Sequence, residues 1–179
     1  MAFKEISIRN LVYSPLKLIG EDWLLLSAGN EEKYNGMTIS WGSFGTIWDK
    51  KGSEGHLPTI NVYVRPQRYT YELMEENEYF SVCKLKDIYK DMHGVLGSKS
   101  GRDTDKMNEV GLLPIFKDNT VYYEQAELVM ICRKLYTQQL TEESFVDKDI
   151  IDLCYSNKDF HHMYIGEIVK VLVNEQKEG

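Results

Sequence analysis

Six short runs of strand-forming residues, separated by turn residues, constrain the fold of this chain more than any other feature. Residues 59–64 show the pattern best, because apolar and polar side chains alternate there until Pro66 ends the strand. The run at residues 163–173 is long enough to cross the wall of a barrel or to bend at Gly166. The other runs are residues 23–28, 37–41, 79–83 and 128–132. This pattern predicts a mainly β protein.

Helical patterns are few and short. The first predicted helix follows Pro66, and the second has apolar residues at helical spacing and is closed by Gly94. Asp103 or Thr104 is expected to cap the third, which ends at Gly111. The four predicted helices lie at residues 68–77, 85–92, 106–110 and 147–154. Many strands with a few short helices favour an antiparallel barrel over an alternating parallel sheet.

The charge balance fits one acidic domain, which we expect to span residues 1–179. The chain has 28 Asp and Glu against 21 Lys and Arg, a formal net charge of -7. That excess argues against a general nucleic-acid binder and against docking to an anionic membrane. Bases are nevertheless concentrated in residues 61–70 and 84–106. An acidic chain can still bind one phosphate group where bases gather in this way.

Cysteine content and targeting signals indicate the reducing cytoplasm. The three cysteines are widely spaced, with no CxxC pair, so neither a disulfide framework nor a thiolate zinc site is expected. The first ten residues lack the apolar stretch of a signal peptide. Adjacent histidines, His161 and His162, would point to opposite faces of a strand, so we expect no metal site there.

Several common catalytic motifs are absent: GxGxxG, GxxxxGK[ST], GxSxG and HExxH. Three clusters of polar and basic residues stand out instead. Residues 97–102 (Gly-Ser-Lys-Ser-Gly-Arg) suit an anion, because glycines let backbone N–H groups converge beside cations. Residues 65–70 (Arg-Pro-Gln-Arg-Tyr-Thr) place arginines at the start of a helix. An ordinary surface loop and a solvated turn are the alternatives for these two clusters.

The third cluster is residues 35–42 (Asn-Gly-Met-Thr-Ile-Ser-Trp-Gly). In a regular strand, Thr38, Ser40 and Gly42 share one polar face, which is natural for a strand that lines a ligand. The alternative for Trp41 and Trp48 is a place in the core.

Taken together, these clusters resemble the flavin reductase-like family of FMN-binding split barrels, which includes flavoredoxin. Residues 35–41 resemble the family's N-x-M-T-x-S-W strand, and residues 65–70 its R-x-T segment before a helix. Residues 97–106 resemble its S-G-R-x-x-D-K loop. His162, followed by Gly166 and Glu167, resembles its late H-x-x-x-G-E-V strand. Met107, Cys83 and the single Pro58 depart from the family's pattern, and none of these departures removes a polar contact to the flavin.

The resemblance implies a homodimer of antiparallel split β-barrels of Greek-key type, each with one FMN near the subunit interface. The Thr38–Trp41 end of the strand would line the flavin ring and ribityl chain, and the two basic clusters would hold the phosphate. Trp48 and His162 would wall the nicotinamide side, and His162 is the one candidate catalytic residue. The cofactor-binding residues so implied are Met37, Thr38, Ile39, Ser40, Trp41, Arg65, Arg68, Tyr69, Thr70, Ser98, Lys99 and Ser100.

The implied activity is that of an NAD(P)H-dependent flavin reductase, which transfers hydride to FMN N5 and on to free flavin, oxygen or a protein. The lack of a nucleophile or metal fits this chemistry, because the cofactor performs the reaction. Two alternatives stay open at this point. One is a flavoredoxin-like electron carrier that does not oxidise NAD(P)H itself, and the other is a relative that has lost its flavin.

Overall fold

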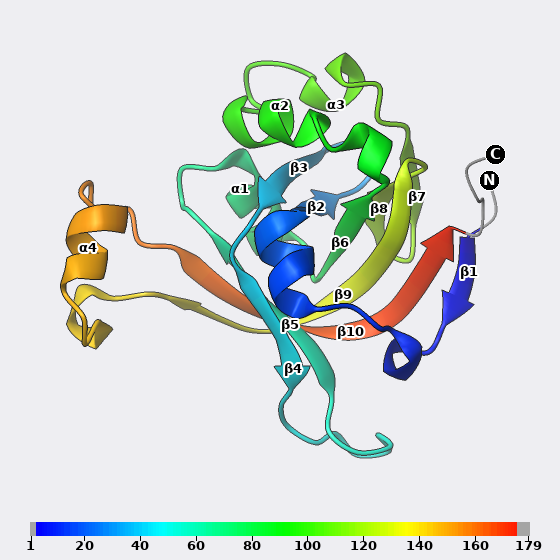
Figure 1. The fold of residues 1–179 in the computed structure, drawn as a ribbon, viewed down its shortest axis with the longest axis horizontal. Helices are drawn as coiled ribbons and strands as arrows, with labels where there is room; N and C mark the ends of the chain where they lie inside the picture. Colours follow the sequence, from blue (N-terminus) through cyan, green and yellow to red (C-terminus); the bar gives the residue numbers. More distant parts are fainter. Residues whose placement is uncertain (1–2, 175–179) are drawn as a thin grey trace.

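Most of the chain forms one antiparallel sheet. The computed structural model describes residues 3–174 (Figure 1). The strands of the main sheet are β1 (Phe3–Ile6), β2 (Leu24–Gly29), β3 (Tyr34–Ile39), β4 (Gly42–Thr46), β5 (Pro58–Val64), β6 (Tyr79–Leu85), β9 (Ala126–Gln139) and β10 (His162–Asn174). Their order is β3-β2-β6-β9-β10-β5-β4, and β1 pairs with β10 outside this path. A separate two-stranded sheet holds β7 (Pro114–Lys117) and β8 (Thr120–Tyr123).

The prediction of a mainly β, antiparallel fold with a few short helices is confirmed. The α-helices are α1 (Tyr69–Glu76), α2 (Met92–Ser98), α3 (Lys106–Glu109) and α4 (Asp149–Cys154). Short 3-10 turns lie at Ile8–Asn10, Asp87–Tyr89 and Glu142–Ser144, and a π-helical turn lies at Lys17–Glu21. The helices α1, α3 and α4 fall within the predicted segments.

The helix predicted at residues 85–92 is wrong. Leu85 belongs to β6, where it pairs with Ala126, so strand pairing overrides the helical spacing of the apolar residues. The helix α2 starts only at Met92 and runs through Gly94, which was expected to end it. The strand predicted at residues 37–41 is also too long, because β3 ends at Ile39. Ser40 and Trp41 lie beyond the strand and Gly42 begins β4, so Thr38, Ser40 and Gly42 do not share one face of a single strand as expected.

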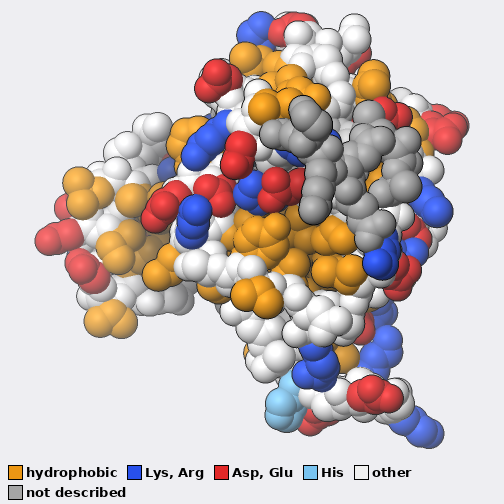
Figure 2. Space-filling model, turned by 45° about the vertical axis from the view of Figure 1, so that its right-hand side comes forward, with side chains coloured by type: hydrophobic (Ala, Val, Ile, Leu, Met, Phe, Trp, Pro, Cys, Tyr) orange, Lys and Arg blue, Asp and Glu red, His pale blue; other side chains and the backbone are white. Residues whose placement is uncertain are grey.

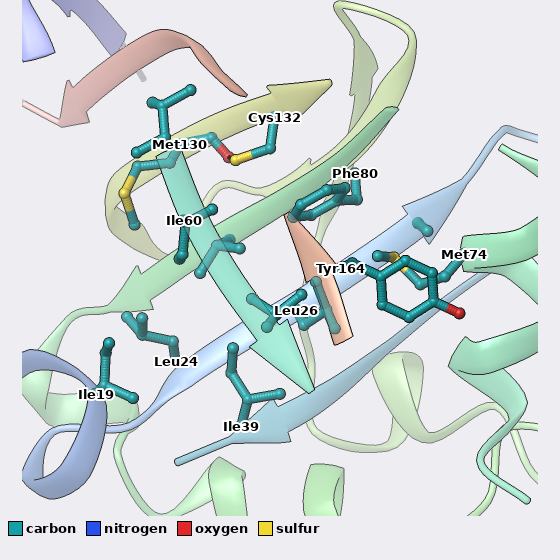
Figure 3. Close-up of a cluster of buried hydrophobic side chains, with 14 of the residues drawn as sticks. Ile19, Leu24, Leu26, Ile39, Ile60, Met74, Phe80, Met130, Cys132 and Tyr164 are labelled. Atoms are coloured by element: carbon teal, nitrogen blue, oxygen red, sulfur yellow. Dashed lines mark hydrogen bonds between the residues drawn. The ribbon is translucent and has the colours of Figure 1, made fainter. Parts of the chain in front are cut away.

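Alternating side chains divide the interior into two cores, one on each face of the sheet. On β2, Leu24 and Leu26 point into the first core, whereas Leu25 points into the second. Figure 3 shows the first core, where Phe80 and Tyr164 lie among aliphatic side chains. The second core lies beneath β8, α2 and α3 and includes Leu96 and Met107.

The long strand β10 changes register at Gly166. Its pairing with β9 shifts between Ile165 and Gly166, as expected for a bend at this glycine. A Cβ at Gly166 would lie 2.5 Å from Cζ of Phe80, so only glycine lets the strand approach that ring.

The helices and hairpins are placed unevenly around the sheet (Figure 1). The helices α2 and α3 lie together at one end, beside β3. Beyond the sheet, β9 and β10 continue as an arm that carries α4, and the β4–β5 hairpin projects separately. Figure 2 shows a face where apolar side chains gather above that hairpin, bordered by a row of charged groups. Within residues 3–174, no helix is both long and apolar enough to cross a membrane.

Candidate functional site

Two adjoining pockets open where β3 ends beside α1 and α2. The first, which we call the ring pocket, has a volume of about 250 Å³. The second, which we call the phosphate pocket, has a volume of about 130 Å³. Met37 and Arg68 line both pockets, so the two pockets lie side by side. The ring pocket is lined by Met37, Thr38, Ile39, Ser40, Trp41, Tyr63, Arg65, Arg68 and His161.

The phosphate pocket gathers cations and hydroxyls from three elements. Arg68, Tyr69 and Thr70 come from the start of α1, and Lys106 comes from the start of α3. The loop between α2 and α3 adds Ser98, Lys99, Ser100 and Gly101, and Asn35, Met37 and Gln67 complete the lining. Every cofactor-binding residue implied by the sequence therefore lines one of the two pockets, although the role of each stays a prediction.

Two cations from neighbouring elements fix the end of α2. Arg68 donates from Nη1 to the carbonyl oxygen of Gly97 at 3.1 Å. Lys106 donates from Nζ to the carbonyl oxygens of Leu96, at 2.8 Å, and Lys99, at 3.0 Å. The carbonyl groups at a helix C-terminus lack partners within the helix, so these bonds stabilise the turn that leads into the phosphate pocket.

Lys106 is a site residue that the sequence reasoning missed. It is buried, and burial lowers its pKa to about 8, with the nearby charge of Arg68 acting in the same direction. Its position follows from Asp105, whose side chain caps α3 by accepting from the backbone N–H of Asn108 at 3.2 Å. Asp103 and Thr104, the caps predicted from the sequence, are therefore wrong. The Asp-Lys pair in the quoted loop motif was the available signal.

A buried pair holds α1 against β3 and the loop. Asn35 donates from Nδ2 to the hydroxyl oxygen of Thr70 at 2.7 Å, and Thr70 is fully buried. Because Thr70 accepts this bond, it keeps its own hydroxyl proton to donate. A Cβ at Gly101 would lie only 2.2 Å from Oδ1 of Asn35, so glycine is required for the loop to approach this closely.

Aromatic side chains form one wall of the ring pocket. The rings of Trp41 and His161 lie 5.0 Å apart, centre to centre. Nδ1 of His161 lies 2.9 Å from the hydroxyl of Tyr155, which orients the imidazole. Burial lowers the pKa of His161 to about 4, assisted by the positive charge of Arg65. His161 is therefore neutral at pH 7 and presents an uncharged ring to the pocket.

Arg65 lines the ring pocket but is already engaged by the α4 arm. It forms an ion pair with Asp159 and donates from Nη2 to the carbonyl oxygen of Cys154 at 2.8 Å. Its guanidinium also lies over the ring of Tyr155, at 5.2 Å. Arg65 thus fastens the arm to the end of β5, a role that the sequence did not indicate.

Trp48 and His162 do not line either pocket. Trp48 lies in the β4–β5 hairpin, with its ring 6.2 Å from that of Tyr136. His162 stacks on Tyr71, with ring centres 5.0 Å apart and planes 15° apart. His161 immediately precedes β10, which begins at His162, and the structure brings His161 rather than His162 beside Trp41. The alternation of the strand allowed either histidine, and only the fold decides between them.

The comparison with protein families matches residues 53–179 to the flavin reductase like domain, which is more than half of the chain. The chain belongs to the flavin reductase-like family. The N-terminal part of the site, on β3, precedes the matched range. No curated protein matches the sequence. Solved structures of this family show the same split-barrel fold.

The similar structures are distant in sequence. A flavoredoxin from Methanosarcina acetivorans has a TM-score of 0.65 and 22% identity, covering 98% of this chain and 78% of that one. An FMN-binding domain of a flavin reductases-like enzyme from Shewanella baltica OS155 has a TM-score of 0.65 and 15% identity, covering 96% and 77%. The styrene monooxygenase flavin reductase from Pseudomonas putida S12 has a TM-score of 0.58 and 20% identity, covering 86% and 80%.

Among residues 3–174, no group of three or more His, Cys, Asp or Glu side chains lies together in a way that could hold a metal ion. The ring and phosphate pockets are built instead from hydroxyl, cationic and aromatic groups.

Proposed function

We propose that this protein binds FMN across the two pockets and acts as an NAD(P)H-dependent flavin reductase. The observation that carries the proposal is that a small cationic pocket lies beside a larger polar and aromatic one, with Met37 and Arg68 lining both. FMN has the same division, with a phosphate at one end and a ring system at the other.

The phosphate pocket fits a phosphomonoester by the chemistry of its donors. Arg68, Lys99 and Lys106 supply positive charge, and the hydroxyls of Thr70 and Ser100 supply neutral donors. Charge-assisted hydrogen bonds of this kind are stronger than those between neutral groups. Lys99 also pairs with Glu109 at 2.5 Å on the surface, so a ligand would compete with that carboxylate.

In the ring pocket, the residues would bind and orient the flavin ring. Bound FMN would supply the redox chemistry, accepting hydride from a nicotinamide at N5 and passing electrons to free flavin, oxygen or a protein. Trp41 is 45% exposed and offers an aromatic surface against which a planar ring can pack. His161, held neutral by burial, offers a hydrogen bond without adding a charge. Tight orientation of the reacting rings supplies much of the rate enhancement.

We also propose that the protein is a homodimer. Trp41 and Trp48 are each 45% exposed, and an apolar groove of about 190 Å³ lies between the N-terminal segment and the β4–β5 hairpin. Apolar surface of this kind is typical of an interface between subunits. A second copy of the chain would cover the open side of the ring pocket and exclude water from it.

The reducing cytoplasm is the proposed location. Cys83 and Cys132 are buried free thiols, and burial raises the pKa of Cys83 to about 12, so this thiol stays protonated and inert.

The competing function is electron transfer by bound FMN without oxidation of NAD(P)H, because two of the similar structures are named flavoredoxins. Steady-state oxidation of NADH and NADPH, with and without added flavin, separates the two. Oxidation of either nucleotide supports the flavin reductase, whereas oxidation of neither supports the electron carrier. A purified protein that is colourless and does not take up added FMN would overturn both.

A further inference from the structure

One hydroxyl on β3 is held by a single residue of α2. Oγ1 of Thr38 lies 2.9 Å from the carbonyl oxygen of His93 and 3.0 Å from Nδ1 of the same residue. His93 is buried, and α2 lies close against the strand here, since a Cβ at Gly97 would be 3.4 Å from Cβ of Thr38. The ring pocket strand and α2 therefore meet at Thr38.

Counting protons assigns the direction of both hydrogen bonds. Two oxygen atoms 2.9 Å apart need a proton between them, and only the Thr38 hydroxyl can supply one to the His93 carbonyl. The hydroxyl then has no proton left for the imidazole, so Nδ1 has to donate to the Thr38 oxygen. His93 is thereby fixed as the tautomer with hydrogen on Nδ1, and a ligand that reaches the Thr38 oxygen meets a lone pair.

The surroundings of His93 keep the ring neutral and fixed. Burial lowers the pKa of His93 to about 4, and the positive charges of Lys90 and Lys84 act in the same direction. The ring of Trp23 meets that of His93 edge-on, at 6.2 Å and 83°. The neutral imidazole has one proton, and the hydrogen bond to Thr38 uses it.

We propose that His93 is a positioning residue of the flavin site, which couples the ring pocket to the phosphate pocket by donating from Nδ1 to Thr38. Thr38 lines the ring pocket. The helix α2 has His93 near its start and ends at Ser98, which lines the phosphate pocket. The proposal rests on the proposed binding of FMN. It implies that contacts with the phosphate reach full strength only while His93 holds the strand in register with the helix.

The test compares FMN with riboflavin, which lacks the phosphate. The readout is the phosphate advantage, defined as the Kd of riboflavin divided by that of FMN. In His93→Leu the phosphate advantage should fall at least threefold, and in His93→Asn, whose amide N–H can replace Nδ1–H, it should stay near the wild-type value. Thr38→Val should reproduce the fall, and adding His93→Leu to it should cause no further change.

A purely structural role predicts a different result. His93→Leu would then lower the melting temperature but weaken both flavins equally, and this outcome would overturn the proposal. Thr38→Val is isosteric and serves as the test if His93→Leu does not fold. In flavin-free wild type, ¹⁵N NMR should show hydrogen on Nδ1 of His93, and hydrogen on Nε2 would also overturn the proposal. If the wild-type protein binds neither flavin, the proposed function is overturned. The NMR measurement of the His93 tautomer still tests the hydrogen bond from His93 to Thr38 in that case.

Discussion

Arg68 donates from Nη1 to the carbonyl oxygen of Gly97 at 3.1 Å, which joins the N-cap of α1 to the last turn of α2. This one bond uses only part of the guanidinium, which has five N–H donors. Arg68 also lines both pockets, so its remaining donors can reach a ligand at the junction. Arg68 therefore both holds α1 against α2 and supplies positive charge to the site.

The first prediction concerns the charge of Arg68. Arg68→Ala should weaken FMN by about 2–3 kcal/mol, or roughly 30- to 150-fold, through loss of charge-assisted contacts to the phosphate. The binding of riboflavin should weaken much less, because for this ligand only the hydrogen bond from Arg68 to Gly97 is lost. Fluorescence titration of both flavins measures the difference. Arg9→Ala removes a surface arginine that contacts Glu54 and should leave both affinities unchanged. Equal losses for both flavins in Arg68→Ala would contradict a phosphate contact.

The second prediction concerns Lys99, whose Nζ is paired with Glu109 at 2.5 Å. Lys99→Ala should weaken the binding of FMN more than that of riboflavin. The loss of FMN affinity should be smaller than in Arg68→Ala, because Lys99 is an exposed cation that already has a carboxylate partner. The same titrations measure this. Glu109→Gln releases Lys99 and should strengthen FMN slightly. If Lys99→Ala affects both flavins alike, Lys99 does not contact the phosphate.

The third prediction is a pH dependence from Lys106, whose pKa burial lowers to about 8. A bound phosphate dianion favours the charged lysine, so FMN binding above pH 8 requires uptake of a proton. FMN affinity should thus fall as the pH rises from 8, by up to about tenfold per unit, while riboflavin affinity stays nearly constant. Titrations between pH 7 and 9.5 measure both slopes.

The matched variant for this effect is Lys106→Arg, which keeps the charge at every pH in that range. Its FMN affinity should lose the pH dependence above 8, even if the longer side chain lowers the affinity overall. A wild-type slope that is the same for FMN and riboflavin would show that Lys106 does not sense the phosphate.

The strands with strong local patterns could be predicted from the sequence, and those without could not. β5 alternates and was found, whereas its partner β4 reads Gly-Ser-Phe-Gly-Thr and has little intrinsic preference for a strand. It forms because Gly42 pairs with Val62 and Phe44 with Ile60. Pairing between distant segments leaves no local signal, which is also why β1, the partner of β10, is not predicted. β7 and β8 pair with each other across a two-residue turn, and each has only four residues, which is short for a strand signal.

The residues of the site were easier to predict than their contacts. The implied cofactor-binding residues lie on loops and at the ends of strands and helices, where polar groups have little structural reason to cluster, and the fold brings them to two adjoining pockets. The choice of His161 over His162 depended on which of the two rings meets Trp41 at the start of β10. The burial of Lys106 and the contacts of Arg65 with the α4 arm depend on tertiary packing between distant segments, which no local sequence pattern reveals.

The fourth prediction is a loss of stability in acid. The folded protein keeps His93 and His161 neutral, since burial lowers the pKa of each to about 4, whereas unfolded histidines titrate near pH 6.5. Their contribution is complete above pH 6.5 and is lost as the pH falls toward 4, by at most about 1.4 kcal/mol per histidine per unit. Urea unfolding at several pH values measures this slope.

The variants separate these two histidines from the carboxylates that also titrate in this range. His93→Asn combined with His161→Asn should unfold with a shallower pH dependence between 6.5 and 4. His56→Asn is the control, because His56 is exposed and pairs with Asp49 on the surface. A double variant with the wild-type slope would show that carboxylates alone cause the acid sensitivity.

The fifth prediction concerns Gly166, at the register shift of β10. Gly166→Ala places a methyl group 2.5 Å from Cζ of Phe80, and this overpacking should cost about 1–3 kcal/mol of the free energy of unfolding. Gly94→Ala is the matched control, since nothing lies within 4 Å of that site in α2, and it should gain about 0.5–1 kcal/mol. In a protein that already carries Phe80→Leu, adding Gly166→Ala should lower the free energy of unfolding by less than it does in wild type, because the smaller side chain leaves room for the methyl group. Urea midpoints of wild type, the three single variants and the double variant measure these effects. A Gly166→Ala protein as stable as Gly94→Ala would show that the strand can move away from Phe80.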